Sequence, residues 1–91
     1  MNLQTFETRL RLLPCVVCHH MGMDGRCEEL HHAGHDTDRS DWNQVPLCAA
    51  HHQGPNGIHG LKRRGFESRY NITEMDLLAI TRKLYAKEFN A

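Results

Sequence analysis

The residue types that bind transition metals are confined to one part of this 91-residue chain. All four cysteines and all eight histidines lie between Cys15 and His59. A chain of this length forms one small domain, and a core of that size often needs disulfides or a bound metal for stability. The sequence has no signal-peptide pattern and no apolar run of membrane-spanning length, so we expect a cytoplasmic protein with reduced thiols and no membrane partner. The clustering therefore predicts metal binding rather than disulfides.

The formal net charge of zero hides an uneven distribution along the chain. Residues 15–59 carry six acidic and two basic side chains, whereas residues 60–91 carry four acidic and seven basic ones. A neutral total argues against a protein that is held to nucleic acid by bulk charge alone, but it leaves local phosphate contacts open. The candidates for such contacts, which can equally be solvated surface cations, are Arg39, Lys62, Arg63 and Arg64.

The pattern of apolar and turn-forming residues predicts one small α+β domain over residues 1–91. Two short strands, residues 27–32 and 42–48, can pair as a hairpin across a polar loop. Helices are expected at residues 2–13 (which a strand would also fit), at 49–53, at 61–71 with an interruption at Gly65, and after Thr73, which forms a capping box with Asp76. The metal-binding core then covers about residues 15–59, and the C-terminal helices cover about 61–89.

Two residue pairs have the spacing of a zinc site. Cys15 and Cys18 form one pair, and Cys48 and His51 form the other. Two intervening residues let one tight turn present both side chains to a single tetrahedral ion, so the four residues predict a structural Cys3His zinc site. The alternative is a set of buried free thiols with a surface histidine. Cys27 has no partner at this spacing, and we expect it to be a small buried residue.

The remaining histidines predict a second ion. If His51 binds zinc, His52 lies about 100° further round the same helix and can face the hairpin. It then becomes a candidate ligand opposite His31, and His59 could complete the set. Imidazole ligands with open positions suit a catalytic ion better than a structural one. The alternative is that these residues and His32 are ordinary polar surface residues.

Taken together, these residues resemble the His-Asn-His (HNH) nuclease family. Its ββα-metal fold places a histidine at the end of the first strand, an asparagine at the second strand and a histidine on the following helix. His32 matches the first histidine, Asn43 the asparagine and His52 the last histidine. His31 takes the place of a metal ligand, as in the nuclease colicins, which also have two adjacent histidines. His51 departs from the family pattern, because a cysteine is usual in the second zinc pair.

The resemblance covers about residues 15–59, and a looser similarity to small phage and prophage HNH nucleases of the recombination-enhancement type extends toward residue 70. It is carried by "PLCAAHHQGPNGIHG" and "FESRY". The HNH resemblance implies a metal-dependent DNA endonuclease in which His32 is the general base and Asn43 orients that ring. A divalent ion (Mg²⁺, Mn²⁺, Ni²⁺ or Zn²⁺) is then bound by His31, His52 and His59.

Two other functions fit the same residues. One is a zinc-stabilised nucleic-acid-binding module without catalysis, and the other is a protein–protein adaptor that binds one metal ion per chain. The residues leave the oligomeric state open, including a dimer that would cut both strands. His35, close to the histidine pair, is expected to be a surface residue of the loop.

Overall fold

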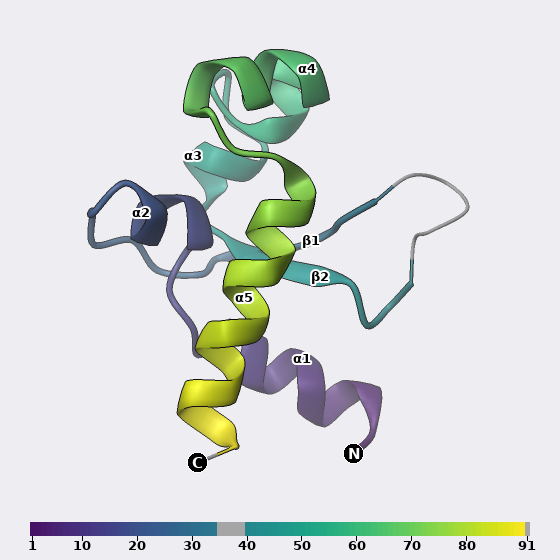
Figure 1. Ribbon diagram of the computed structural model, residues 1–91. Coiled ribbons are helices and arrows are strands. Elements are labelled where there is room, and N and C mark those ends of the chain that lie inside the picture. Colours follow the sequence, from purple (N-terminus) through teal and green to yellow (C-terminus); the bar gives the residue numbers. More distant parts are fainter. Residues whose placement is uncertain (35–39, 91) are drawn as a thin grey trace.

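The computed structural model describes residues 1–34 and 40–90 of the protein. Within these ranges the elements are, in chain order, α1 (Leu3–Arg11), α2 (Val16–His20), β1 (Glu29–His32), β2 (Gln44–Leu47), α3 (Ala49–His52), α4 (Ile58–Tyr70) and α5 (Glu74–Phe89). Helices surround a two-stranded sheet, so the fold is α+β, as the sequence predicts (Figure 1). Arg39, predicted to contact phosphate, and His35, predicted to be a surface residue, lie outside the described residues.

The predicted hairpin is present as an antiparallel pair of strands. Its register sets His31 opposite Val45 and His32 opposite Gln44. Because consecutive strand residues point to opposite faces, His31 and His32 leave the strand on opposite sides. The second strand stops at Leu47, one residue earlier than predicted, because the next residue is already the N-cap of α3.

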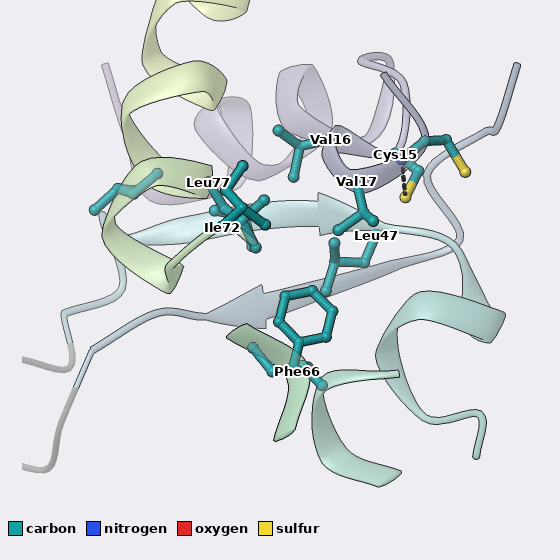
Figure 2. Packing of buried hydrophobic residues seen from close by; sticks show 11 residues of the cluster. Cys15, Val16, Val17, Leu47, Phe66, Ile72 and Leu77 are labelled. Atoms are coloured by element: carbon teal, nitrogen blue, oxygen red, sulfur yellow. Dashed lines mark hydrogen bonds between the residues drawn. The ribbon is translucent and has the colours of Figure 1, made fainter. Parts of the chain in front are cut away.

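One face of the sheet carries the main apolar core, which also includes residues of α2, α4 and α5 (Figure 2). Its fully buried side chains include Val16, Val17, Val45, Leu47, Phe66 and Leu77. Burying a side chain of this size contributes about 1.5 to 3 kcal/mol. A second cluster of Leu10, Leu13 and Tyr85 joins α1 to α5. Figure 1 shows α5 crossing the sheet from the side of α4 to the side of α1, so the last helix connects both ends of the domain.

Two features of the helices differ from the sequence prediction. The chain forms a short helix, α2, directly after Cys15, where the sequence analysis identifies no helix. The interruption expected at Gly65 lies instead at Lys62, whose φ of 61° and ψ of 169° break the helical geometry inside α4. Gly65 itself continues the helix, since a small residue only weakens helical geometry and does not forbid it.

The last helix begins where its capping residues predict. Thr73 Oγ1 accepts a hydrogen bond from the Asp76 amide at 3.0 Å, and an Asp76 carboxylate oxygen accepts one from the Thr73 amide at 3.1 Å. This reciprocal pair is the predicted capping box, and it satisfies two amides that the helix leaves without a partner. Over residues 1–34 and 40–90, no helix has the length and apolar character needed to cross a membrane.

Candidate metal centres

The two pairs with zinc-site spacing converge on one point. Their ligand atoms all lie within 4.8 Å of one another and belong to Cys15, Cys18, Cys48 and His51. His51 Nδ1 lies 3.2 Å from Cys48 Sγ and 3.4 Å from Cys18 Sγ. The distance from His51 Nδ1 to Cys15 Sγ is 3.7 Å. Neighbouring sulfur and nitrogen ligands of a tetrahedral zinc ion are about 3.6 Å apart, so the four side chains could hold a zinc ion as a Cys3His site.

The local chain explains how the first cysteine pair reaches this geometry. Cys15 is the N-cap of α2, and its Sγ accepts a hydrogen bond from the Cys18 amide at 3.5 Å. The returning chain is held next to it, because the Cys15 amide donates to the Gly25 carbonyl at 2.9 Å. A side chain at Gly25 would occupy the position of Cys18 Sγ. Glycine at this position is therefore a requirement of the cluster that the cysteine spacing alone did not reveal.

Protonation of the cluster follows from its burial. In the metal-free protein, burial and the neighbouring Cys15 thiol raise the pKa of Cys18 to about 12. Burial also raises the pKa of Cys15 and lowers that of His51. Near neutral pH the thiols of Cys15 and Cys18 are therefore protonated and the imidazole of His51 is neutral. Zinc binds thiolates, so loading this site must release protons.

The second predicted ion site is also assembled from distant segments. Ligand atoms of His31 in β1, His52 in α3 and His59 in α4 all lie within 4.8 Å of one another. Ring centres are 5.2 Å apart for His31 and His52, 5.1 Å for His31 and His59, and 4.6 Å for His52 and His59. Three imidazoles that share one ion at about 2.1 Å have ring centres roughly 4.6 to 5.3 Å apart. The three rings thus have the spacing of a metal site that leaves positions for water or substrate.

Two carboxylates that sequence reasoning missed support these rings. Glu29 Oε1 lies 2.6 Å from His52 Nδ1, and Glu74 Oε2 lies 3.3 Å from His31 Nε2. Burial acts to raise the pKa of Glu74, but hydrogen bonds from His31 and Gly34 outweigh it and lower the pKa below its usual value. A signal existed for Glu29, because residues two apart in a strand share a face. None existed for Glu74, which is 43 residues away from His31 in the sequence.

The predicted general base and asparagine lie beside the histidine cluster. His32 is about one third exposed, and its Nε2 lies 3.0 Å from Asp41 Oδ1. The Asn43 carbonyl accepts a hydrogen bond from the Ala33 amide at 2.8 Å, next to His32 in the chain. Its side-chain oxygen accepts one from Arg82 at 2.8 Å. Asn43 therefore holds the backbone at the end of β1 and links it to α5.

One cavity of about 280 Å³ connects most of these groups. It is lined by His31, His32, Gly34, Ile58, His59, Lys62, Arg63 and Glu74. Two of the predicted phosphate contacts, Lys62 and Arg63, are thus at the cavity together with the predicted base. Arg63 also forms an ion pair with Glu67 at 3.5 Å. Arg64 is exposed on α4 and is not among the described residues that line the cavity.

Cys27 is a partial exception to the sequence prediction. It lies outside the Cys3His set, as expected, but it is half-buried rather than buried. Its thiol donates to the Glu29 carbonyl at 3.5 Å, and burial raises its pKa. The side chain also lines a cavity of about 670 Å³ beside the cysteine cluster, which explains why it keeps contact with solvent.

Comparison of the chain with models of protein families, with curated proteins and with solved structures finds no match. The HNH resemblance therefore stays an expectation carried by individual residues. What the structure adds is their placement: two clusters of side chains that could bind a metal ion, one built around cysteines and one around imidazoles, each taking one residue from the short helix α3.

Proposed function

We propose that the protein is a metal-dependent endonuclease of the HNH type, which hydrolyses phosphodiester bonds in DNA. One observation carries the proposal: a single cavity is lined by His32, by two residues of the histidine cluster and by two basic residues of α4. These are His31 and His59, and Lys62 and Arg63. An ion site, an imidazole outside that site and phosphate-binding side chains are the three components that such a hydrolysis needs.

Substrate binding is assigned to Lys62 and Arg63. Both side chains are exposed at the cavity, where they can contact the oxygens of a phosphodiester. A divalent ion bound by His31, His52 and His59 would supply positive charge to the phosphate and to the leaving oxygen. The neutral net charge of the chain is compatible with this arrangement, because the contacts are local.

His32 is assigned the role of general base. Imidazole is well suited to accept a proton from water near neutral pH. Asp41 Oδ1 lies 3.0 Å from His32 Nε2 and can accept a hydrogen bond from it, which leaves Nδ1 of the ring to take the proton. Asn43 contributes by holding the adjacent backbone through Ala33. In this mechanism His32 needs no bond to the ion.

The Cys3His cluster is assigned a structural role. All four of its ligand positions are filled by protein side chains, which is typical of structural zinc and leaves no position for substrate. His51 belongs to this cluster and its neighbour His52 to the other. Zinc would therefore fix the helix that presents His52.

A plasmid-nicking assay with Mg²⁺, Mn²⁺, Ni²⁺ or Zn²⁺ tests the proposal. We expect cleavage with at least one of these ions, and we expect His32→Ala to lower the rate by about 10²- to 10⁴-fold. Zinc content and the unfolding transition should be unchanged in that variant. His20→Ala is the matched control, because His20 is an exposed histidine of α2 outside both clusters.

Two outcomes would contradict the proposal. If the protein binds DNA but does not cleave it with any of the ions, it is a zinc-stabilised binding module. If His32→Ala abolishes cleavage but also removes zinc or the cooperative unfolding transition, the residue has a structural role and the assignment of the base is wrong.

A further inference from the structure

We propose that Glu74 is a positioning residue of the three-histidine cluster, which fixes the His31 ring from the first turn of α5. The inference rests on the ion site of the proposed function but not on cleavage. Glu74 is supplied by the C-terminal helix, outside the hairpin and the short helix that provide His31 and His52. The site would then depend on a segment that its metal-binding motif does not include.

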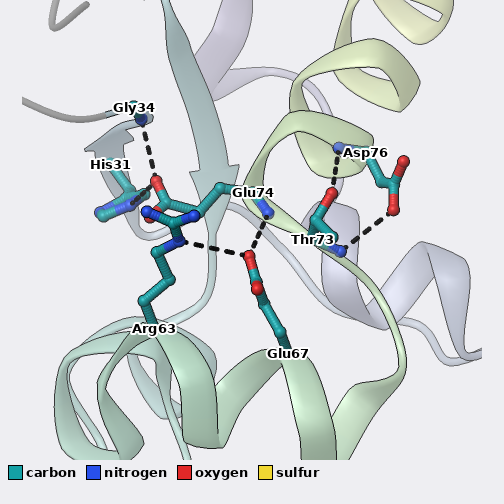
Figure 3. Close-up of polar contacts among 7 residues, drawn as sticks. All are labelled: His31, Gly34, Arg63, Glu67, Thr73, Glu74 and Asp76. Carbon is teal, nitrogen blue, oxygen red and sulfur yellow. Dashed lines mark hydrogen bonds and ion pairs between the residues drawn. The ribbon is translucent and has the colours of Figure 1, made fainter.

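The contacts of Glu74 are concentrated on one oxygen. Oε2 lies 3.3 Å from His31 Nε2 and 3.0 Å from the amide nitrogen of Gly34, as Figure 3 shows. The side chain of Glu74 is 13% exposed and that of His31 is 8% exposed. Glu74 is thus mostly shielded from water, and a shielded carboxylate is costly unless it is hydrogen-bonded. One partner is a residue of β1 and the other lies two residues beyond the end of that strand, so Glu74 holds the ring and the chain that follows the strand at the same time.

The backbone at Gly34 is shaped for this contact. Its φ of 106° lies in the region that residues with a side chain rarely adopt. In this conformation the Gly34 amide reaches the oxygen that also contacts His31. The chain therefore turns immediately after the histidine pair and presents two donors to one acceptor.

A carboxylate sets which nitrogen of a neutral histidine carries the proton. An ionised carboxylate only accepts hydrogen bonds, so the proton of His31 lies on Nε2 and Nδ1 is left for the ion. Glu29 does the same for His52 with the nitrogens exchanged, because it contacts Nδ1 and leaves Nε2. His52 Nε2 is the atom that lies 3.0 Å from His59 Nε2. Two carboxylates from different elements thus hold two rings of one cluster.

The capping of α5 is separate from this role. The capping box is formed by Thr73 and Asp76, whose contacts do not include the Glu74 carboxylate. The Glu74 amide donates to Glu67 Oε2 at 3.4 Å, and Glu67 also pairs with Arg63 (Figure 3). Asp76→Asn therefore disturbs the start of the same helix without removing the contact to His31, and it is a matched control for Glu74→Gln.

The experiment compares the wild-type protein, Glu74→Gln and Asp76→Asn, each loaded with zinc at the cysteine cluster and freed of other ions. Long-range proton–nitrogen NMR at about pH 8.5 reports the tautomer of His31. Titration with Mn²⁺ and with Co²⁺ reports the affinity of the histidine cluster. We expect Glu74→Gln to lower that affinity by about 10- to 100-fold and to raise the population of the Nδ1-protonated tautomer of His31. Asp76→Asn should lower the unfolding temperature and leave both readouts unchanged.

An unchanged tautomer in Glu74→Gln overturns the inference, even if ion affinity falls, because Glu74 would then act as a ligand and not through His31. An unchanged affinity overturns it as well. If Asp76→Asn reproduces both effects, they arise from the helix and the inference is wrong. Failure of the proposed function gives a different result: the wild-type protein would lack nuclease activity, or His31→Ala would leave ion affinity intact. The tautomer of His31 is measured without any cleavage, so the two failures can be told apart.

Discussion

The two clusters of potential metal ligands in this domain differ in how they are built. Each cysteine-containing pair comes from one turn of chain, and the four ligands of this cluster are all provided by protein. The histidine cluster takes one ring from each of β1, α3 and α4, and carboxylates from two further positions support it. A closed cluster from local pairs can fold around its ion, whereas an open cluster from distant elements depends on a fold that already exists.

The largest expected effect comes from removing a cysteine ligand. Cys18→Ser should abolish zinc binding and with it the cooperative unfolding transition, since structural zinc often supplies most of the folding free energy of a small domain. Zinc content by mass spectrometry and thermal unfolding followed by circular dichroism measure this. Cys27→Ser is the control, because Cys27 lies outside the cluster. A folded, zinc-free Cys18→Ser protein would contradict the structural role of the cluster.

Adjacent histidines on α3 allow the sharpest test of the comparison. His51→Ala should behave like the loss of a cysteine, while His52→Ala should keep zinc and the fold and lose affinity for the second ion by on the order of 100-fold or more. The two variants differ only in which of two neighbouring side chains is removed. If both lose zinc, or if neither changes the binding of a second ion, the division into two clusters is wrong.

Zinc binding by the cysteine cluster should depend on pH. Because burial raises the pKa of Cys15 and raises that of Cys18 to about 12, zinc must displace protons from these thiols at neutral pH. Affinity of the cysteine cluster should therefore rise with pH, by about tenfold per unit for each thiol proton released. Competition with a chelator between about pH 6 and 8 measures the slope. A flat profile would mean that the thiols are already ionised without zinc.

The strained backbone at Lys62, beside the cavity of the histidine cluster, predicts a smaller effect on the free energy of unfolding. Lys62 has a positive φ inside α4 and lines the cavity, and such a conformation costs a residue with a side chain about 1 to 3 kcal/mol. Lys62→Gly should stabilise the protein by about 1 kcal/mol and weaken DNA binding. Urea unfolding and a binding titration at two salt concentrations measure the two effects. Loss of stability would show that the Lys62 side chain contributes more than its backbone costs.

The cysteine cluster could be predicted from the sequence because its information is local. The spacing of Cys15 to Cys18 and of Cys48 to His51 is enough to bring each pair to one ion. The capping box of Thr73 and Asp76 was predictable for the same reason, and the structure confirms it. Features that depend on a few neighbouring residues were therefore identified without any knowledge of the fold.

Other features depend on contacts between distant segments. Glu74 meets His31 only because α5 crosses the sheet, and no local pattern identifies it. The helix α2 forms because Cys15 caps it and because burial of Val16 and Val17 stabilises it, which overrides the weak helix propensity of valine. The break at Lys62 instead of Gly65 likewise reflects the packing of α4 rather than its composition.

The shared helix α3 has a consequence for the order of metal loading. It is four residues long, and its last two residues, His51 and His52, belong to different clusters. A helix this short is not stable alone, so the position of His52 depends on zinc binding at His51 as well as on the contact of its ring with Glu29. We therefore expect the histidine cluster to fill after the cysteine cluster and to empty before it. The availability of zinc would then control whether the second ion binds, and a chelator strong enough to remove zinc would leave both clusters without an ion.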